Sequence, residues 1–123
     1  MKTLLTLALL CLGLQLRAQE KEDIVWSETD LRMGTVPLKE TVHRTVHYTN
    51  RGSKPVVIGK VDYTCGCIQV NFRQTPLLPG GTDSLEVNYR GQEKGLFYKT
   101  ITVRWSNGTT DELTVSGNVA GKR

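Results

Sequence analysis

The chain lacks the features that mark nucleic-acid-binding and membrane-spanning proteins. Its 123 residues carry a formal charge of +4, and setting aside Lys2 and Arg17 with the first 18 residues leaves +2. No block of lysine and arginine and no basic stripe with interleaved aromatics is present, so nucleic-acid binding is not expected. No segment after residue 18 is long and apolar enough to span a bilayer, and neither an internal repeat nor a low-complexity tract occurs.

The motifs of common enzymes are absent as well. The sequence has no Gly-x-Ser-x-Gly elbow, no phosphate-binding loop and no His-Glu-x-x-His. Two acidic side chains could still come together in space as the catalytic pair of a glycosidase. The candidates lie beside turns or at outward-facing strand positions, which favours ordinary solvent-exposed side chains: Glu86, Glu93, Asp111 and Glu112. Trp26 and Trp105 could form a platform for a sugar or peptide, and core or rim packing is the favoured interpretation. We therefore expect no enzyme and no cofactor.

The first 18 residues are typical of a cleaved secretory signal peptide. Lys2 gives a short positive start, an apolar run follows from Leu4 to Leu14, and Ala18 is a small residue before the expected cleavage site. A retained membrane anchor is the first alternative, although the apolar run is shorter than the roughly 20 residues that cross a bilayer. Lipid attachment at Cys11 is the second. Removal of the signal would leave 105 of the 123 residues, enough for one domain and too few for two.

Beyond the leader the apolar residues recur with the period of β-strands, and no window shows a helical stripe. Apolar and polar residues alternate in about seven short runs separated by turn-forming residues, with the first run near Ile24 to Glu28. This pattern predicts an antiparallel β-sandwich, with a barrel as the alternative. The expected inward side chains are Val46, Tyr48, Ile58, Val61, Val70, Phe72, Leu85, Val87, Ile101, Val103, Leu113 and Val115. Asn107-Gly108 predicts a type I′ hairpin. Arg44 interrupts an apolar face, which predicts that its strand meets the edge of a sheet or the rim of the core.

Several short segments occur in an order and spacing typical of one bacterial family. They are Tyr48-Thr49-Asn50-Arg51-Gly52, Cys65-Gly66-Cys67, Pro79-Gly80, Gly95 to Ile101, Ser106-Asn107 and Gly117-Asn118-Val119. Through them the chain resembles, from about Trp26 to Val119, a bacterial exported family, Domain of Unknown Function 1573. One departure is Ile68, where the family usually carries threonine. The resemblance implies export and an immunoglobulin-like sandwich of the sperm-protein and cilia-associated type. It implies no activity, because the family has none established.

Cys65 and Cys67 are the only cysteines after the leader. Side chains two residues apart on a strand point to the same face, so they can bond only if Gly66 bends the chain and brings the Cα atoms within about 7 Å. The apolar parity also changes near Gly66, which predicts a β-bulge or a crossover between sheets.

Three interpretations of this pair remain open. In the first, the pair is a local disulfide, or two unreactive thiols, that shapes a bend in a binding module. In the second, it cycles between a dithiol and a strained, easily reduced disulfide, although the preceding residues Tyr63 and Thr64 supply no positive charge to lower a thiol pKa. Two thiolates could also bind Cu(I) or Zn(II), with His43 and His47 as the only nitrogen candidates. On a strand these histidines lie about 13 Å apart and cannot easily share one ion.

The sequence therefore predicts an all-β protein whose immunoglobulin-like domain at residues 24–119 follows a signal peptide at residues 1–18. We expect it to be exported to the periplasm, the cell envelope or the outside. The expected function is a non-catalytic binding or adaptor module whose partner is a protein or glycan of the envelope, recognised through an exposed edge strand. The alternative is a thiol–disulfide redox or soft-metal binding protein that uses Cys65 and Cys67.

Overall fold

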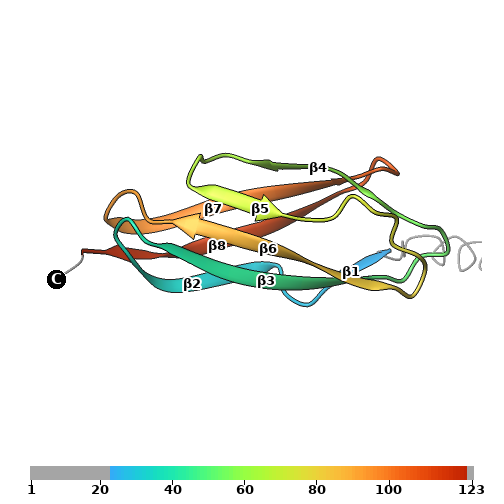
Figure 1. The fold of residues 1–123 in the computed structure, drawn as a ribbon, viewed down its shortest axis with the longest axis horizontal. Helices are drawn as coiled ribbons and strands as arrows, with labels where there is room; N and C mark the ends of the chain where they lie inside the picture. Colours follow the sequence, from blue (N-terminus) through green and yellow to red (C-terminus); the bar gives the residue numbers. More distant parts are fainter. Residues whose placement is uncertain (1–22, 122–123) are drawn as a thin grey trace, which may run out of the picture.

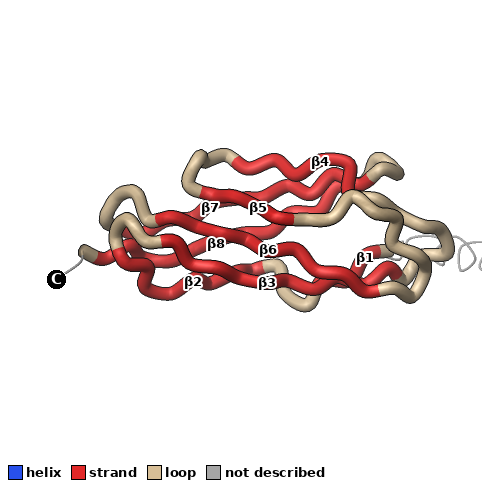
Figure 2. Tube along the Cα trace, viewed as in Figure 1, coloured by secondary structure: helices blue, strands red, loops and turns tan. Residues whose placement is uncertain are grey.

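The computed structural model describes residues 23–121, and the signal peptide expected at residues 1–18 lies outside them. Figure 2 shows only strands and loops in the described part of the chain. The eight strands are β1 (Ile24–Trp26), β2 (Asp30–Pro37), β3 (Thr41–Asn50), β4 (Ile58–Tyr63), β5 (Ile68–Asn71), β6 (Thr82–Arg90), β7 (Gly95–Trp105) and β8 (Thr110–Ala120). Within residues 23–121 there is no helix able to cross a membrane.

The strands form two sheets that face each other as a sandwich (Figure 1). One sheet has the order β1-β3-β6-β5 and the other the order β2-β8-β7-β4. All neighbours run antiparallel except β2 and β8, which are parallel. The chain changes sheet at each step from β1 to β5 and again from β6 to β7. The step from β4 to β5 contains Gly66, so of the bulge and the crossover expected there the structure has the crossover. The predicted all-β sandwich is confirmed, with eight strands in place of about seven and with one parallel pair, β2 and β8, where only antiparallel pairs were expected.

The core lies between the two sheets. Ten of the twelve side chains expected inside are buried, whereas Val61 and Phe72 are only partly covered. The largest side chains that are almost fully buried are Leu31, Ile58, Leu85, Ile101 and Leu113. Each contributes about 1.5–3 kcal/mol through its removal from water.

No alternation in the sequence predicts β2, because a bulge disrupts the period of this strand. Leu31 and Val36 are both fully buried although they are five residues apart. The register of β2 against β8 shifts between Arg32 and Thr35, and Gly34 lies within that shift with a φ of 71°. One extra residue in a strand reverses the parity of everything after it, so Leu31 and Val36 reach the same face.

Of two local predictions, the edge position of Arg44 is confirmed and the type I′ turn is wrong. β3 is second in the strand order, but β1 pairs with it only from Tyr48 to Asn50, so within residues 23–121 the segment around Arg44 pairs with β6 alone. Arg44 lies over the crossover from β1 to β2, where its guanidinium donates to both carboxylate oxygens of Glu28, at 2.7 and 2.9 Å, and to the carbonyl of Arg32. The hydrogen bonds from Arg44 hold the pKa of Glu28 below its usual value. The expected type I′ turn is a four-residue loop between β7 and β8, because Gly108 has a positive φ and Asn107 does not.

An aromatic cluster joins the two sheets at the end of the sandwich where β1 lies. The ring centroids of Trp26 and Trp105 are 6.2 Å apart, and that of Tyr48 lies 5.1 Å from the first and 5.6 Å from the second. Asp111 Oδ2 accepts a hydrogen bond from both indole nitrogens, at 3.0 Å from Trp26 and 2.9 Å from Trp105. The two tryptophans therefore pack at the core and its rim, as expected, and Asp111 satisfies the polar atom of each.

The buried phenol in this cluster makes stability depend on pH at the alkaline end. Burial, aided by the negative charge of Asp83, raises the pKa of Tyr48 to about 12. The unfolded chain loses the proton near pH 10, so the stabilisation is complete below pH 10 and is lost as the pH rises to about 12. A shift of this size corresponds to about 2–3 kcal/mol. Urea unfolding between pH 8 and 11.5 should show this decline, and Tyr48→Phe should flatten it. An equally steep decline in Tyr48→Phe would contradict the assignment.

Candidate functional site

The two cysteines lie in the short loop that carries the chain from β4 in one sheet to β5 in the other. The structure joins them in a disulfide, with Cα atoms 5.1 Å apart. Backbone hydrogen bonds also hold this loop: Ile68 N–H donates to the carbonyl of Cys65 at 3.2 Å, and Arg90 N–H donates to that of Cys67 at 2.9 Å. Closing so short a loop stabilises the fold by only about 1.5 kcal/mol on the chain-entropy model. A structural role alone is therefore a weak reason for the pair.

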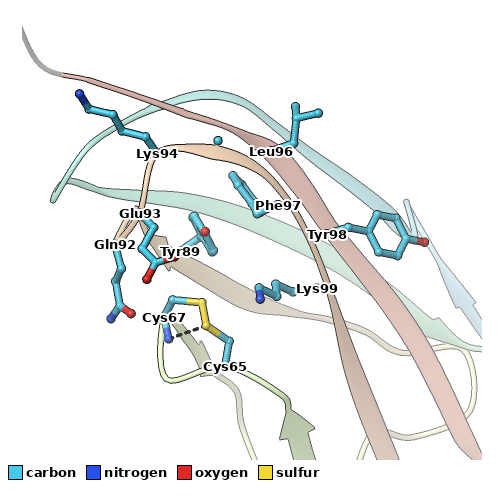
Figure 3. Close-up of a pocket in the computed structure, with 11 residues that line it drawn as sticks. Cys65, Cys67, Tyr89, Gln92, Glu93, Lys94, Leu96, Phe97, Tyr98 and Lys99 are labelled. Carbon is cyan, nitrogen blue, oxygen red and sulfur yellow. Dashed lines mark hydrogen bonds between the residues drawn. A yellow bond between two sulfur atoms is a disulfide. The ribbon is translucent and has the colours of Figure 1, made fainter.

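The two sulfurs differ in their surroundings. The side chain of Cys67 is buried, with only 5% of the residue exposed, whereas Cys65 is partly exposed. The backbone N–H of Cys67 donates to the Sγ of Cys65 at 3.1 Å, as drawn in Figure 3. Cys65 thus offers the more accessible sulfur, and a hydrogen-bond donor already points at it.

A pocket of about 370 Å³ opens beside the disulfide, and we call it the crossover pocket. Figure 3 shows its walls, which come from the β4–β5 loop, the end of β6, the β6–β7 loop and the start of β7. Its lining residues are Cys65, Cys67, Tyr89, Gln92, Glu93, Lys94, Gly95, Leu96, Phe97, Tyr98 and Lys99. Two lysines and one glutamate line it, so its side chains carry one net positive charge.

Two stacked rings form the apolar part of the crossover pocket. Tyr89 and Phe97 have centroids 3.9 Å apart and planes only 12° from parallel. Burial raises the pKa of the Tyr89 phenol above its usual value. Gly117 of β8 lies across from Phe97 in the register, and a Cβ at that position would lie 2.7 Å from the Phe97 ring. Any larger residue at this inward-facing position would clash with the Phe97 ring, so the position requires glycine.

The start of β7 also exposes apolar side chains on its other face. Leu96 is 89% exposed and Tyr98 is 69% exposed. Strand alternation turns both away from the disulfide, and Phe97 and Lys99 toward it (Figure 3). A second, shallower hollow lies on that face and is lined by Gly34, Leu96, Phe97, Tyr98, Ser116, Gly117 and Asn118. We call this the β7 surface.

The remaining candidates from the sequence do not assemble into a catalytic or metal site. His43 and His47 are exposed on β3, and His43 Nδ1 forms a hydrogen bond with Asn88 Oδ1. In residues 23–121 no group of three His, Cys, Asp or Glu side chains is placed to hold a metal ion. Among the four acids, Asp111 binds the two indoles, Glu86 accepts from Asn71, and only Glu93 lines the crossover pocket.

Sequence reasoning identified the cysteines and missed the other residues of the site. Lys94 and Lys99 lie about 30 positions after the cysteines in the chain and meet them only because β7 passes beside the crossover loop. One signal was available for the β7 surface. Leu96 and Tyr98 are apolar on the outward parity of a strand whose inward parity is already apolar at Phe97, Ile101 and Val103.

Comparisons with known proteins agree with this architecture. The model of a family described as "Protein of unknown function (DUF1573)" matches residues 24–119. No curated protein matches the chain.

Solved structures with the same fold share little sequence with this chain. The PapD-like domain 7 of human CEP192 aligns with a TM-score of 0.73 at 11% identity, over 87% of this chain and 94% of that domain. A protein of unknown function from Porphyromonas gingivalis aligns at 0.66 and 18% identity, over 77% of this chain and 46% of that one. The CupB2 chaperone of Pseudomonas aeruginosa aligns at 0.59 and 13% identity, over 77% of this chain and 55% of that one. At such identities the likeness establishes the fold alone.

Proposed function

The chain belongs to the DUF1573 family of proteins of unknown function, and on that premise we propose that it is an exported, non-catalytic binding module that recognises a polypeptide segment through the β7 surface. The observation that carries the proposal is the exposure of Leu96 and Tyr98, at 89% and 69%, beside a hollow. Export is supported by the signal-like residues 1–18 and by the disulfide, since disulfides persist mainly in oxidising compartments.

The shape and chemistry of the β7 surface favour a polypeptide with an apolar anchor. Gly34 and Gly117 have no side chains, so the hollow between Leu96, Tyr98 and the edge of Phe97 can take an aromatic or branched aliphatic group. Such anchors supply most of the affinity of protein interfaces. Lys94 is exposed next to the start of β7, so an acidic residue beside the anchor would be favoured. An aliphatic side chain as exposed as Leu96 suits a peptide better than a sugar, which stacks on aromatic faces.

The fold offers precedent for this kind of role. The structural relatives include a chaperone, and in residues 23–121 no group of three His, Cys, Asp or Glu side chains is placed to hold a metal ion. Strands are also rigid supports, so Leu96 and Tyr98 are presented without the entropic cost of ordering a loop on binding.

Peptide selection tests the proposal. A display library of random twelve-residue peptides should yield sequences with an aromatic or aliphatic anchor and acidic neighbours. Leu96→Asp and Tyr98→Ala should each weaken the selected peptides at least about tenfold by calorimetry, equivalent to about 1.4 kcal/mol. Because both side chains are exposed, neither change should alter the unfolding free energy by more than about 0.5 kcal/mol.

Leu78→Asp is the matched control, because Leu78 is another exposed leucine, at 63%, in the loop between β5 and β6. It should leave peptide affinity unchanged. Equal loss in Leu78→Asp and Leu96→Asp would contradict the assignment of the surface. Failure to enrich any peptide would contradict a polypeptide partner. Binding to glycans on an array that is lost in Tyr98→Ala would indicate a glycan partner instead.

A further inference from the structure

We propose that Cys65–Cys67 is a thiol–disulfide exchange site that accepts two electrons from a dithiol carried by another protein. The sequence alone argued against such chemistry, because Tyr63 and Thr64 bring no positive charge to the cysteines. The fold supplies that charge at Lys99, which lines the same pocket as both sulfurs and extends toward them in Figure 3, whereas Lys94 extends away from them. A neighbouring ammonium favours a thiolate over a thiol and attracts an incoming thiolate.

The geometry also assigns a role to each sulfur. The crossover pocket, about 370 Å³, gives an incoming cysteine side chain room to approach the disulfide. Cys65 is partly exposed, whereas Cys67 is 5% exposed, so Cys65 Sγ is the atom that can be attacked. The Cys67 N–H that donates to Cys65 Sγ can also stabilise negative charge when that sulfur later leaves. Figure 3 shows the disulfide at the pocket wall, facing the β6–β7 loop and β7.

The exchange proceeds in two balanced steps. A thiolate of the partner attacks Cys65 Sγ, a mixed disulfide forms, and the electron pair of the Cys65–Cys67 bond passes to Cys67 Sγ. The second thiolate of the partner then attacks the partner sulfur attached to Cys65, and the electron pair of the mixed disulfide passes to Cys65 Sγ. The partner is left with a disulfide. Cys65 and Cys67 hold its two electrons and take up two protons.

This activity does not rest on the proposed peptide binding, although Leu96, Phe97 and Tyr98 line both the crossover pocket and the β7 surface. The cysteines line only the crossover pocket, so replacing both with serine should abolish exchange and leave the affinity for selected peptides unchanged. Each proposal can fail without the other.

Trapping experiments on the folded protein test the assignment. In Cys67→Ser, the free Cys65 should form a mixed disulfide with 5,5′-dithiobis(2-nitrobenzoate), located by peptide mass spectrometry. In Cys65→Ser, the buried Cys67 should react at least about tenfold more slowly. Circular dichroism would verify that both variants are folded. Equal rates in the two variants, or reaction only after unfolding in urea, would overturn the proposal.

A transfer experiment and two charge variants complete the test. The wild-type protein, oxidised beforehand with oxidised glutathione, should convert up to one equivalent of a reduced Cys-x-x-Cys peptide to its disulfide while its circular dichroism stays constant. Lys99→Gln should slow this transfer and Glu93→Gln should accelerate it, each by about two- to fivefold, because they change the pocket charge in opposite directions. If no transfer occurs, or if the transfer rate is the same in wild type, Lys99→Gln and Glu93→Gln, the disulfide is only a local clamp.

Discussion

Replacing Asn50 with alanine should lower the free energy of unfolding by about 3 kcal/mol, because three hydrogen bonds would be lost inside the protein. Asn50 is completely buried at the end of β3. Its side-chain amide donates to the carbonyls of Lys54 at 2.8 Å and Leu77 at 2.9 Å, and its oxygen accepts from Gly52 N–H at 2.9 Å. Alanine would leave these backbone groups without their partner where water has little access. Urea unfolding at pH 7 would measure the loss.

Two further substitutions separate hydrogen bonding from volume at this position. Asn50→Asp keeps the size and the acceptor for Gly52, but it places an oxygen against the carbonyls of Lys54 and Leu77. It should therefore destabilise at least as much as alanine. Asn118→Ala removes an exposed asparagine of β8 and should change the unfolding free energy by no more than about 0.5 kcal/mol. A loss of similar size at positions 50 and 118 would show that the buried amide has no special role.

Asn50 also shows how far the sequence could predict the fold. It was visible only as one residue of the segment Tyr48 to Gly52, and nothing in that segment indicates that it connects two loops. The backbone of Asn50 itself bonds to Gly80 and Gly81, in the turn before β6. The side chains of β3, β6, β7 and β8 could be assigned because strict alternation marks a half-buried strand. The contacts between their loops depend on how the strands are ordered, and alternation carries no information about order.

The same limit applies to the candidate site. A pair of cysteines around Gly66 is conspicuous in the sequence, and the parity change beside it correctly predicted the crossover. The crossover pocket exists because that crossover brings the β4–β5 loop beside the start of β7. Lys94 and Lys99 are ordinary surface lysines in the sequence. Their relation to the cysteines follows from the neighbouring positions of β4 and β7 in one sheet, which no local pattern encodes.

Replacing Trp105 with alanine should have the larger effect, a loss of about 3–5 kcal/mol. Trp105 ends β7 with only 4% of its surface exposed, and it contacts Trp26 of β1 and Tyr48 of β3 in the opposite sheet. Its removal would leave a cavity between the sheets, and Asp111 would lose one of its two indole donors. Urea unfolding should show a lower midpoint with an unchanged slope, because the fold and the area exposed on unfolding stay the same.

Tyr98→Ala is the matched control, since it removes an aromatic side chain from the same strand at a position 69% exposed, and it should cost less than about 0.5 kcal/mol. Asp111→Asn separates the contribution of the carboxylate charge from that of ring packing. An amide oxygen can still accept from the indoles but carries no charge, so this change should cost about 1 kcal/mol. A loss in Asp111→Asn as large as in Trp105→Ala would mean that the carboxylate, and not ring packing, holds the two sheets together at this end. A small loss in Trp105→Ala would show that the neighbouring side chains can close the cavity.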